Sequence, residues 1–215
     1  MIPAVHSSTS PKVIKSLIFL ACLLPIFLLV WKGVNGTLSA NPISDITLET
    51  GIWTLRFVVL TLAITPVRKI SGWHALIKVR RMLGLFAFFY GLLHFLTYIW
   101  LDQFFEWQAI VQDISKRRFI TMGLASFVLM IPLAVTSTQK MIRRLGGRRW
   151  DLLHRLIYAT AIGGIIHYVW LVKVFTYRQT IYLLLLLTLL GLRLMWRYRP
   201  HLLRRNIKTE ASRTT

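Results

Sequence analysis

Long apolar runs recur along the whole chain, and they constrain its fold more than any other feature. Each run has about 17–25 residues, which is the length an α-helix needs to cross about 30 Å of hydrocarbon. A soluble domain would not need so much apolar sequence, which makes up 55% of the 215 residues. We therefore predict an all-α membrane protein with one transmembrane domain over residues 1–215, six spans and a basic tail at 198–215. The predicted spans are 13–31, 52–67, 82–101, 119–136, 152–171 and 179–197.

The basic residues lie mostly in the short connections between these runs. A formal net charge of +20 on a soluble protein would suggest a nucleic-acid partner. In a membrane protein, short basic loops instead mark the cytoplasmic side. Placing both termini in the cytoplasm puts 20 of the 27 Lys and Arg on that side, so we predict this orientation and no nucleic-acid partner. The seven residues left outside are Lys32, Arg56, Lys116, Arg117, Arg118, Lys173 and Arg178.

The tryptophans are an independent check on these boundaries. Tryptophan gathers where a span meets the headgroups of the bilayer. The predicted outer ends carry Trp31, Trp53, Trp100 and Trp170, and the predicted inner ends carry Trp150 and Trp196. Both sets favour the same six spans.

Three of the six histidines fall within predicted spans, and two of them predict a haem site. An ionisable side chain in hydrocarbon is a functional candidate, although a neutral histidine bonded between helices explains any single one. At a rise of about 1.5 Å per residue, His94 lies about 12 Å and His167 about 9 Å from the outer ends of their spans. Two imidazoles at similar depth on different helices are what axial ligation of one b-type haem iron requires. The single cysteine, Cys22, forms neither an intramolecular disulfide nor a cysteine cluster.

The third histidine, His154, predicts a second and inner haem site. It precedes His167 by thirteen positions, about 20 Å along the same helix, so one haem cannot use both. On an ideal helix the two side chains point about 140° apart, and a shared face would need a distorted helix. The matching position in the third span is Arg81, so His154 has no obvious partner. The alternatives are His74 in a nearby loop as the second ligand, a non-histidine ligand, a five-coordinate haem, or no second haem.

Glycines and arginines near the histidines have two interpretations each. Glycine lets a porphyrin approach the backbone, but it also lets helices pack closely, so the sequence does not separate these roles. The residues concerned are Gly91, Gly163 and Gly164. Arginine binds the oxyanions of haem propionates or of a flavin phosphate in bidentate fashion, but it also serves as ordinary cytoplasmic charge. The candidates are Arg80, Arg81, Arg148 and Arg149.

Several segments, in order and with fitting loop lengths, resemble a known family. They are LAITPVRK at 62–69, RRMLGL at 80–85, LLHFLTY at 92–98, TSTQKMIRRLG at 136–146, LHRLIY at 153–158 and IHYVWLVK at 166–173. Histidines on the third and fifth of six helices resemble the ferric-reductase-like transmembrane domain, which the NADPH oxidases share. The closer resemblance is to the MsrQ (YedZ) family, the haem-binding membrane subunits of a bacterial periplasmic methionine sulfoxide reductase system.

This resemblance implies a function and a set of partners. The family is expected to take electrons from quinol or a cytosolic flavin reductase, some members with FMN. Electrons then pass through haem b, across the inner membrane, to the periplasmic molybdopterin enzyme MsrP. That enzyme repairs methionine sulfoxide in oxidised envelope proteins. The resemblance places His94, His154 and His167 on the family's three motif histidines, as ligands of haem iron.

The chain differs from the NADPH oxidases after its last span. About eighteen residues follow Arg197, and no G-x-G-x-x-G fingerprint opens a helix after a strand. We therefore expect an electron-transfer subunit rather than a catalytic subunit that oxidises a nicotinamide itself.

Two other functions remain open at this point. One is a proton-coupled small transporter or channel with an intramembrane histidine relay, and the other is an assembly factor without a cofactor. The first is disfavoured because no span carries a buried acid to pair with the histidines and no inverted repeat is visible. Both alternatives predict a colourless protein.

Overall fold

The computed structural model describes residues 11–211 except 173 and 175, with side chains described between residues 13 and 197. This part of the chain is helical and contains no strand. Its elements are α1 (Pro11–Val34), α2 (Pro42–Ser71), the 3-10 turn η1 (His74–Leu76), α3 (Ile77–Leu96), the π-helical turn η2 (Thr97–Asp102), α4 (Trp107–Lys116), α5 (Arg118–Val135), α6 (Gln139–Leu145), α7 (Gly147–Leu153), α8 (Leu156–Leu171) and α9 (Tyr177–Ala211).

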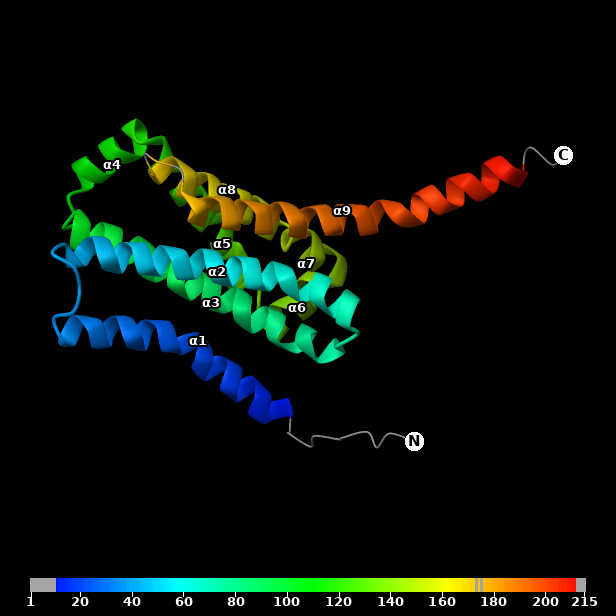
Figure 1. Ribbon diagram of the computed structural model, residues 1–215, viewed down its shortest axis with the longest axis horizontal. Helices are drawn as coiled ribbons and strands as arrows, with labels where there is room; N and C mark the ends of the chain where they lie inside the picture. The colour runs from blue at the N-terminus through cyan, green and yellow to red at the C-terminus, as the bar shows by residue number, and fades with distance from the viewer. Residues whose placement is uncertain (1–10, 173, 175, 212–215) are drawn as a thin grey trace.

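Six segments are long and apolar enough to cross a membrane, which confirms the predicted all-α fold with six spans. The segments are Val13–Val34, Pro42–Ser71, His74–Asp102, Arg118–Val135, Gly147–Leu171 and Tyr177–Arg197. The start of α1 and the end of α9 lie on one side of the bundle, and α4 lies on the opposite side (Figure 1). We call these two sides the termini end and the α4 end.

The second span differs most from its predicted bounds. Asn41 caps α2 by accepting a hydrogen bond from the Ser44 amide at 3.1 Å, and a proline at the first position favours a start there. The helix therefore begins ten residues before the predicted start, and Trp53 and Arg56 lie within it rather than at its edge or outside. The Arg56 guanidinium lies 4.4 Å from the Trp53 ring centroid, and its Nε donates to the Tyr182 hydroxyl at 3.0 Å.

Two antiparallel helix pairs form the core of the bundle. α2 packs most extensively on α3, and α5 packs most extensively on α8. Aromatic stacking joins the pairs, because the Phe127 ring of α5 lies 4.8 Å from the Phe95 centroid and 5.8 Å from that of Phe88, both in α3. α9 covers α2 and α8 on one side. The two pairs thus form a four-helix core with α1 and α9 outside it (Figure 1).

A side chain inserted at a proline attaches α1 to this core. In an undisturbed helix the Ile26 amide would donate to the Cys22 carbonyl. The Tyr90 hydroxyl of α3 bonds both groups, accepting from the Ile26 amide at 3.2 Å and donating to the Cys22 carbonyl at 2.9 Å. Pro25 lies between them, and a proline together with an inserted side chain accounts for the bend of α1 in Figure 1.

The short helix α4, which the sequence did not predict, covers the α4 end. It is amphipathic, with Ile110 buried against the bundle while Trp107 and Val111 are exposed. Before it, Phe104 and Phe105 have φ angles of 46° and 62°, in a region that bulky side chains rarely occupy. An amphipathic helix with exposed aromatic residues is typical of a segment that lies in the membrane interface.

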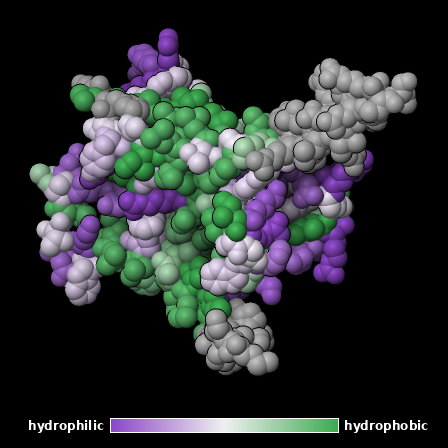
Figure 2. Space-filling model, turned by 45° about the vertical axis from the view of Figure 1, so that its right-hand side comes forward, coloured by the Kyte–Doolittle hydropathy of each residue, from purple (hydrophilic) through white to green (hydrophobic). Residues whose placement is uncertain are grey.

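Apolar side chains also cover much of the remaining surface. In Figure 2 they spread over the middle of the visible face, while hydrophilic side chains gather mainly toward the two ends. Many large apolar side chains of the spans are more than two-fifths exposed, among them Phe27, Leu60 and Leu187. Lipid would cover these surfaces in a membrane protein, so their exposure here agrees with six spans.

Candidate functional site

His94 is held by the neighbouring helix of its own pair. It lies near the end of α3, and its Nδ1 is 2.9 Å from the carbonyl oxygen of Thr47 in α2. A carbonyl oxygen can only accept, so Nδ1 carries the proton and donates it. Nε2 is then left with its lone pair free, which is the form of histidine that binds a metal. Beneath the ring lies Gly51, where a Cβ would be 3.0 Å from Cε1 and 3.1 Å from Nδ1 of His94.

His167 is held in the same way by the other helix pair. It lies in α8, and its Nδ1 donates to the carbonyl oxygen of Phe119 in α5 at 2.7 Å. Nε2 is again the nitrogen with the free lone pair. Gly123 lies beneath this ring, and a Cβ there would be 2.7 Å from Nδ1 and 2.9 Å from Cε1.

The two imidazoles lie next to each other between α3 and α8 at the α4 end. Their ring centroids are 6.0 Å apart and their planes are inclined by 73°. Two metal–nitrogen bonds of about 2 Å and a ring radius of about 1 Å on each side add up to about 6 Å. α3 and α8 have almost no backbone contact with each other, although each is packed along its partner helix. The spacing and the tautomers therefore fit the two axial ligands of a porphyrin iron.

The donor set fits a porphyrin iron better than a bare metal ion. Among the residues that the structure describes, no group of three or more His, Cys, Asp or Glu could hold a metal. Two imidazoles fall short of the four ligands of a structural zinc site, whereas a porphyrin brings four nitrogens of its own.

His154 lies at the termini end, at a break in the fifth span. α7 ends at Leu153 and α8 begins at Leu156, so the ideal-helix rotation between His154 and His167 does not apply. The Trp150 ring stacks on the imidazole with centroids 3.8 Å apart, and His154 Nδ1 lies 3.1 Å from the Trp150 carbonyl oxygen. Its Nε2 is buried and has no hydrogen-bond partner among the described residues. A buried nitrogen with a free lone pair is a suitable ligand atom. Between residues 13 and 197, where side chains are described, no second buried histidine lies at this end of the bundle.

The structure separates the four predicted arginines. Arg80 is half-buried, and the charges of Arg193 and Asp151 act on it. The other three are exposed, and they are Arg81, Arg148 and Arg149. Only Arg80 is therefore turned toward the bundle near His154.

Of the remaining histidines, only His74 has a described side chain, and it joins neither site. His74 is exposed in η1. His6 and the side chain of His201 lie outside the described part of the chain. His74 was one of the open choices for the ligand opposite His154, and its exposure leaves that position without a histidine among the side chains that the structure describes.

The glycines beside the histidines in the sequence pack against helices. A Cβ at Gly91 would be 3.4 Å from a Thr54 methyl group of α2, and one at Gly163 would overlap the Ser126 hydroxyl of α5. The glycines beneath the imidazoles, Gly51 and Gly123, were not predicted. They lie more than forty positions from the histidines that they contact, so only the fold brings them together.

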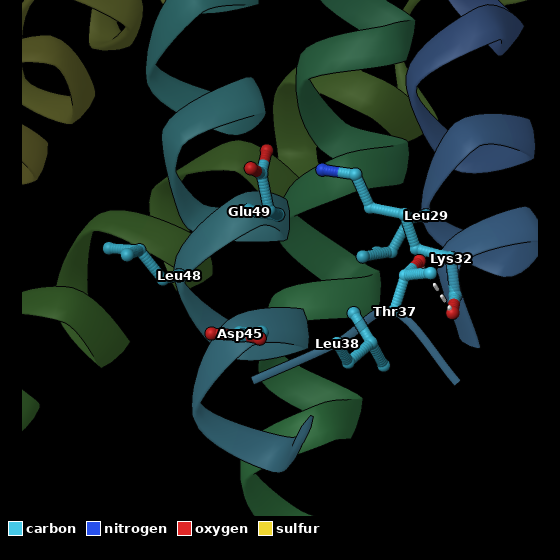
Figure 3. Close-up of a pocket in the computed structure, with 7 residues that line it drawn as sticks. All are labelled: Leu29, Lys32, Thr37, Leu38, Asp45, Leu48 and Glu49. Carbon is cyan, nitrogen blue, oxygen red and sulfur yellow. Dashed lines mark hydrogen bonds between the residues drawn. The ribbon is translucent and has the colours of Figure 1, made fainter. Parts of the chain in front are cut away.

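A polar cavity of about 180 Å³ lies between α1 and α2 at the α4 end (Figure 3). Figure 3 shows Lys32 reaching from the end of α1 toward Glu49 of α2. The cavity is smaller than the usual 300–1,000 Å³ of a cofactor pocket, and no histidine lines it. It is therefore separate from the histidine pair.

Comparison with known proteins identifies the family. Residues 50–165 match the model of the ferric reductase like transmembrane component, a stretch that includes Gly51, His94, Gly123 and His154. Three similar proteins are each named protein-methionine-sulfoxide reductase heme-binding subunit MsrQ. The protein from Azospira oryzae is 54% identical over 86% of this chain and 80% of its own length. The one from Rhodospirillum rubrum is 51% identical over 83% and 86%, and the one from Ralstonia nicotianae is 46% identical over 93% of both chains.

These matches cover most of the chain and confirm the resemblance found in the sequence. The structure agrees with them in its six apolar helices and its all-α bundle. The chain belongs to the ferric-reductase-like transmembrane family and, within it, to the MsrQ family.

Proposed function

We propose that this protein binds haem b between His94 and His167 and carries electrons across the membrane to a methionine sulfoxide reductase. The observation that supports this most strongly is the pair of imidazoles 6.0 Å apart, each with Nδ1 engaged and Nε2 free. The name of the relatives, heme-binding subunit, points to the same cofactor. Haem supplies one-electron chemistry when bound, so the chain's own task is to hold, orient and shield it.

The chain's residues set the conditions of that site. The Thr47 and Phe119 carbonyls fix the tautomer of each imidazole and make the ligating nitrogens more basic. The apolar helices around them keep water away, which lowers the local dielectric constant. Both effects influence the affinity for haem and its reduction potential.

We further propose that electrons travel from the cytoplasmic side to the periplasm of a bacterial inner membrane. The basic loops favour both termini in the cytoplasm, which would place the α4 end and the histidine pair toward the periplasm. The donor would be quinol or a cytosolic flavin reductase, with FMN as a further cofactor, and the acceptor would be the periplasmic molybdopterin enzyme MsrP. Haem at His154, with Arg80 near a propionate or a flavin phosphate, would lie between the donor and the outer pair.

An absorption spectrum of the purified protein tests the cofactor. The detergent-solubilised protein should be red, with the reduced Soret and α bands of b-type haem. His94→Ala and His167→Ala should each remove the same haem, whereas His74→Ala, at an exposed position, should leave the spectrum unchanged. A colourless wild-type protein would support the proton-relay alternative and contradict this proposal.

A second measurement tests the partner. Haem reduced by dithionite should be reoxidised by methionine sulfoxide only when MsrP is present. Reoxidation at the same rate without MsrP would contradict the proposed acceptor, but not the haem site.

A further inference from the structure

The two helix pairs that carry the histidines are built on the same plan. His94 donates to a carbonyl 47 positions earlier, in the preceding span, and His167 donates to a carbonyl 48 positions earlier. In both pairs the glycine beneath the ring comes four positions after that carbonyl, so it faces the ring from the next turn of the same helix. The α2–α3 and α5–α8 pairs thus form an internal structural repeat around the site.

The repeat continues for another turn. Thr54 lies three positions after Gly51, Ser126 lies three positions after Gly123, and each contacts a glycine of the histidine helix. Both hydroxyls donate to the carbonyl four residues earlier in their own helix, at 2.9 Å and 2.8 Å. The agreement over a carbonyl, a glycine and a hydroxyl residue shows that the two glycines hold equivalent places in the fold.

The two glycines leave room for the imidazoles and for nothing larger. Ordinary Cβ contacts lie at 3.4–4 Å, whereas a Cβ at Gly123 would be 2.7 Å from His167 Nδ1 and one at Gly51 would be 3.0 Å from His94 Cε1. The atoms met are parts of a rigid ring and not the tip of a flexible chain. A methyl group would therefore have to turn or displace the ring, and so disturb the Nδ1–H bond to the carbonyl.

We propose that Gly51 and Gly123 are positioning residues that fix the rotation of the two haem-ligating imidazoles. This inference rests on the proposed haem site. Each ring is held on one edge by a carbonyl and on one face by a glycine, so its plane and the direction of Nε2 are set before a ligand arrives. The plane of each axial imidazole affects the electronic structure of the iron, and its hydrogen bond affects how firmly haem is held.

Three Gly→Ala variants of the full-length haem protein test this inference. Gly123→Ala and Gly51→Ala add a methyl group against a ring, the first more severely than the second. Gly191→Ala is the control, because Gly191 is an exposed glycine within the α9 span and its Cβ would meet no atom within 4 Å. All three substitutions favour a helix to the same extent, so intrinsic propensity cancels in the comparison.

Two measurements report the ring positions without relying on activity. The g values of the oxidised low-spin haem report the angle between the imidazole planes, and the rate of haem release to a scavenger protein reports ligand strength. We expect Gly123→Ala to shift the largest g value most and to speed haem release about tenfold. Gly51→Ala should shift both in the same sense but less, and Gly191→Ala should match the wild type.

The outcomes separate this inference from the haem proposal. If the Gly123→Ala protein does not accumulate, Gly51→Ala alone decides the matter. Glycine variants that bind haem with wild-type g values and release rates would overturn the positioning role and leave the haem site intact. A wild-type protein without haem would overturn both.

Discussion

The α4 end and the termini end of the same four-helix core are organised differently. At the α4 end, the two helix pairs of the internal repeat bring together two imidazoles. Each imidazole has a carbonyl partner and a glycine beneath it. At the termini end, the α7–α8 segment offers His154, but the α2–α3 pair offers Arg80. Among the described side chains, the repeat therefore provides matched imidazoles at the α4 end only, and the termini end combines the partly buried His154 with the positive charge of Arg80.

The polar contacts at the termini end support helices rather than a pair of ligands. Proline has no amide hydrogen, so Pro66 leaves the carbonyl of Leu62 without its usual partner in α2. Arg193 of α9 supplies one, donating from Nη2 to the Leu62 oxygen at 2.5 Å and from Nη1 to the Tyr158 hydroxyl at 2.6 Å. At the termini end, the charged side chain of Arg193 thus joins α9 to α2 and α8. At the α4 end, a pair of histidines lies between the helix pairs instead.

The largest expected effect distinguishes the two ends through their haem content. His154→Ala should retain in full the low-spin spectrum that we propose for His94 and His167, because that proposed site takes neither ligand from His154. Any second haem component should disappear, since the buried Nε2 of His154 would be its ligand. Redox titration of the wild type and His154→Ala measures the components, with His167→Ala as the complementary control. Loss of the outer signal in His154→Ala would show that the two ends are one site.

A smaller effect on stability should appear at the termini end. Arg193→Met removes two charge-assisted hydrogen bonds and leaves the Leu62 carbonyl unpaired, so we expect a loss of about 3 kcal/mol. Arg197→Met, an exposed position on the same helix, is the control and should change stability little. Thermal unfolding in detergent measures the loss. The g values should not change, because Arg193 does not contact the histidine pair, and a changed haem signature would mean that the two ends are coupled.

The sequence predicted the fold better than the surroundings of the histidines. The number of spans could be predicted because it follows from the length of the apolar runs alone. The sequence did not predict the capped start of α2 or the amphipathic helix α4. His94 and His167 stood out because an ionisable residue in an apolar run is conspicuous. Gly51 and Gly123 did not stand out in the sequence, because glycine is common in membrane helices. Their contacts with the imidazoles are also formed only in the folded protein. One signal was available, since Gly123 follows Gly51 by 72 positions and His167 follows His94 by 73.

His154 shows a different limit of sequence reasoning. An ideal helix predicted that it points away from His167, but the helix breaks between Leu153 and Leu156, and no proline marks the break. Arg81 was the residue at the matching register of the third span, yet Arg80 is the one turned inward. α3 runs unbroken from Arg80 to His94, and fourteen positions bring Arg80 to within about 40° of His94 on an ideal helix, whereas thirteen positions leave Arg81 about 140° away. Equal residue counts therefore do not place two side chains on one face, and the α7–α8 break changes the rotation further in the fifth span.

The smallest expected effect tests whether the α4-end site depends on α1. Tyr90 lies one turn before His94 in α3, but its hydroxyl is directed to α1, where it bonds the Ile26 amide and the Cys22 carbonyl. Tyr90→Phe keeps the ring and removes both bonds, which should cost about 1–2 kcal/mol of α1 docking and leave the histidine pair intact. Cys22 is buried and is the only cysteine in the chain, so its thiol reports that docking directly.

The labelling rate of Cys22 by a membrane-permeant thiol reagent measures this docking. When opening and closing are fast, the rate follows the population of the undocked state, so about 1.4 kcal/mol corresponds to about tenfold faster labelling. Tyr98→Phe is the matched control, because Tyr98 lies in η2 and its hydroxyl reaches Asp113 of α4 instead. Faster labelling with unchanged g values would show that the repeat holds its imidazoles independently of α1. Altered g values would instead make α1 a third support of the site, on the α2–α3 side only, and the two helix pairs would no longer be equivalent.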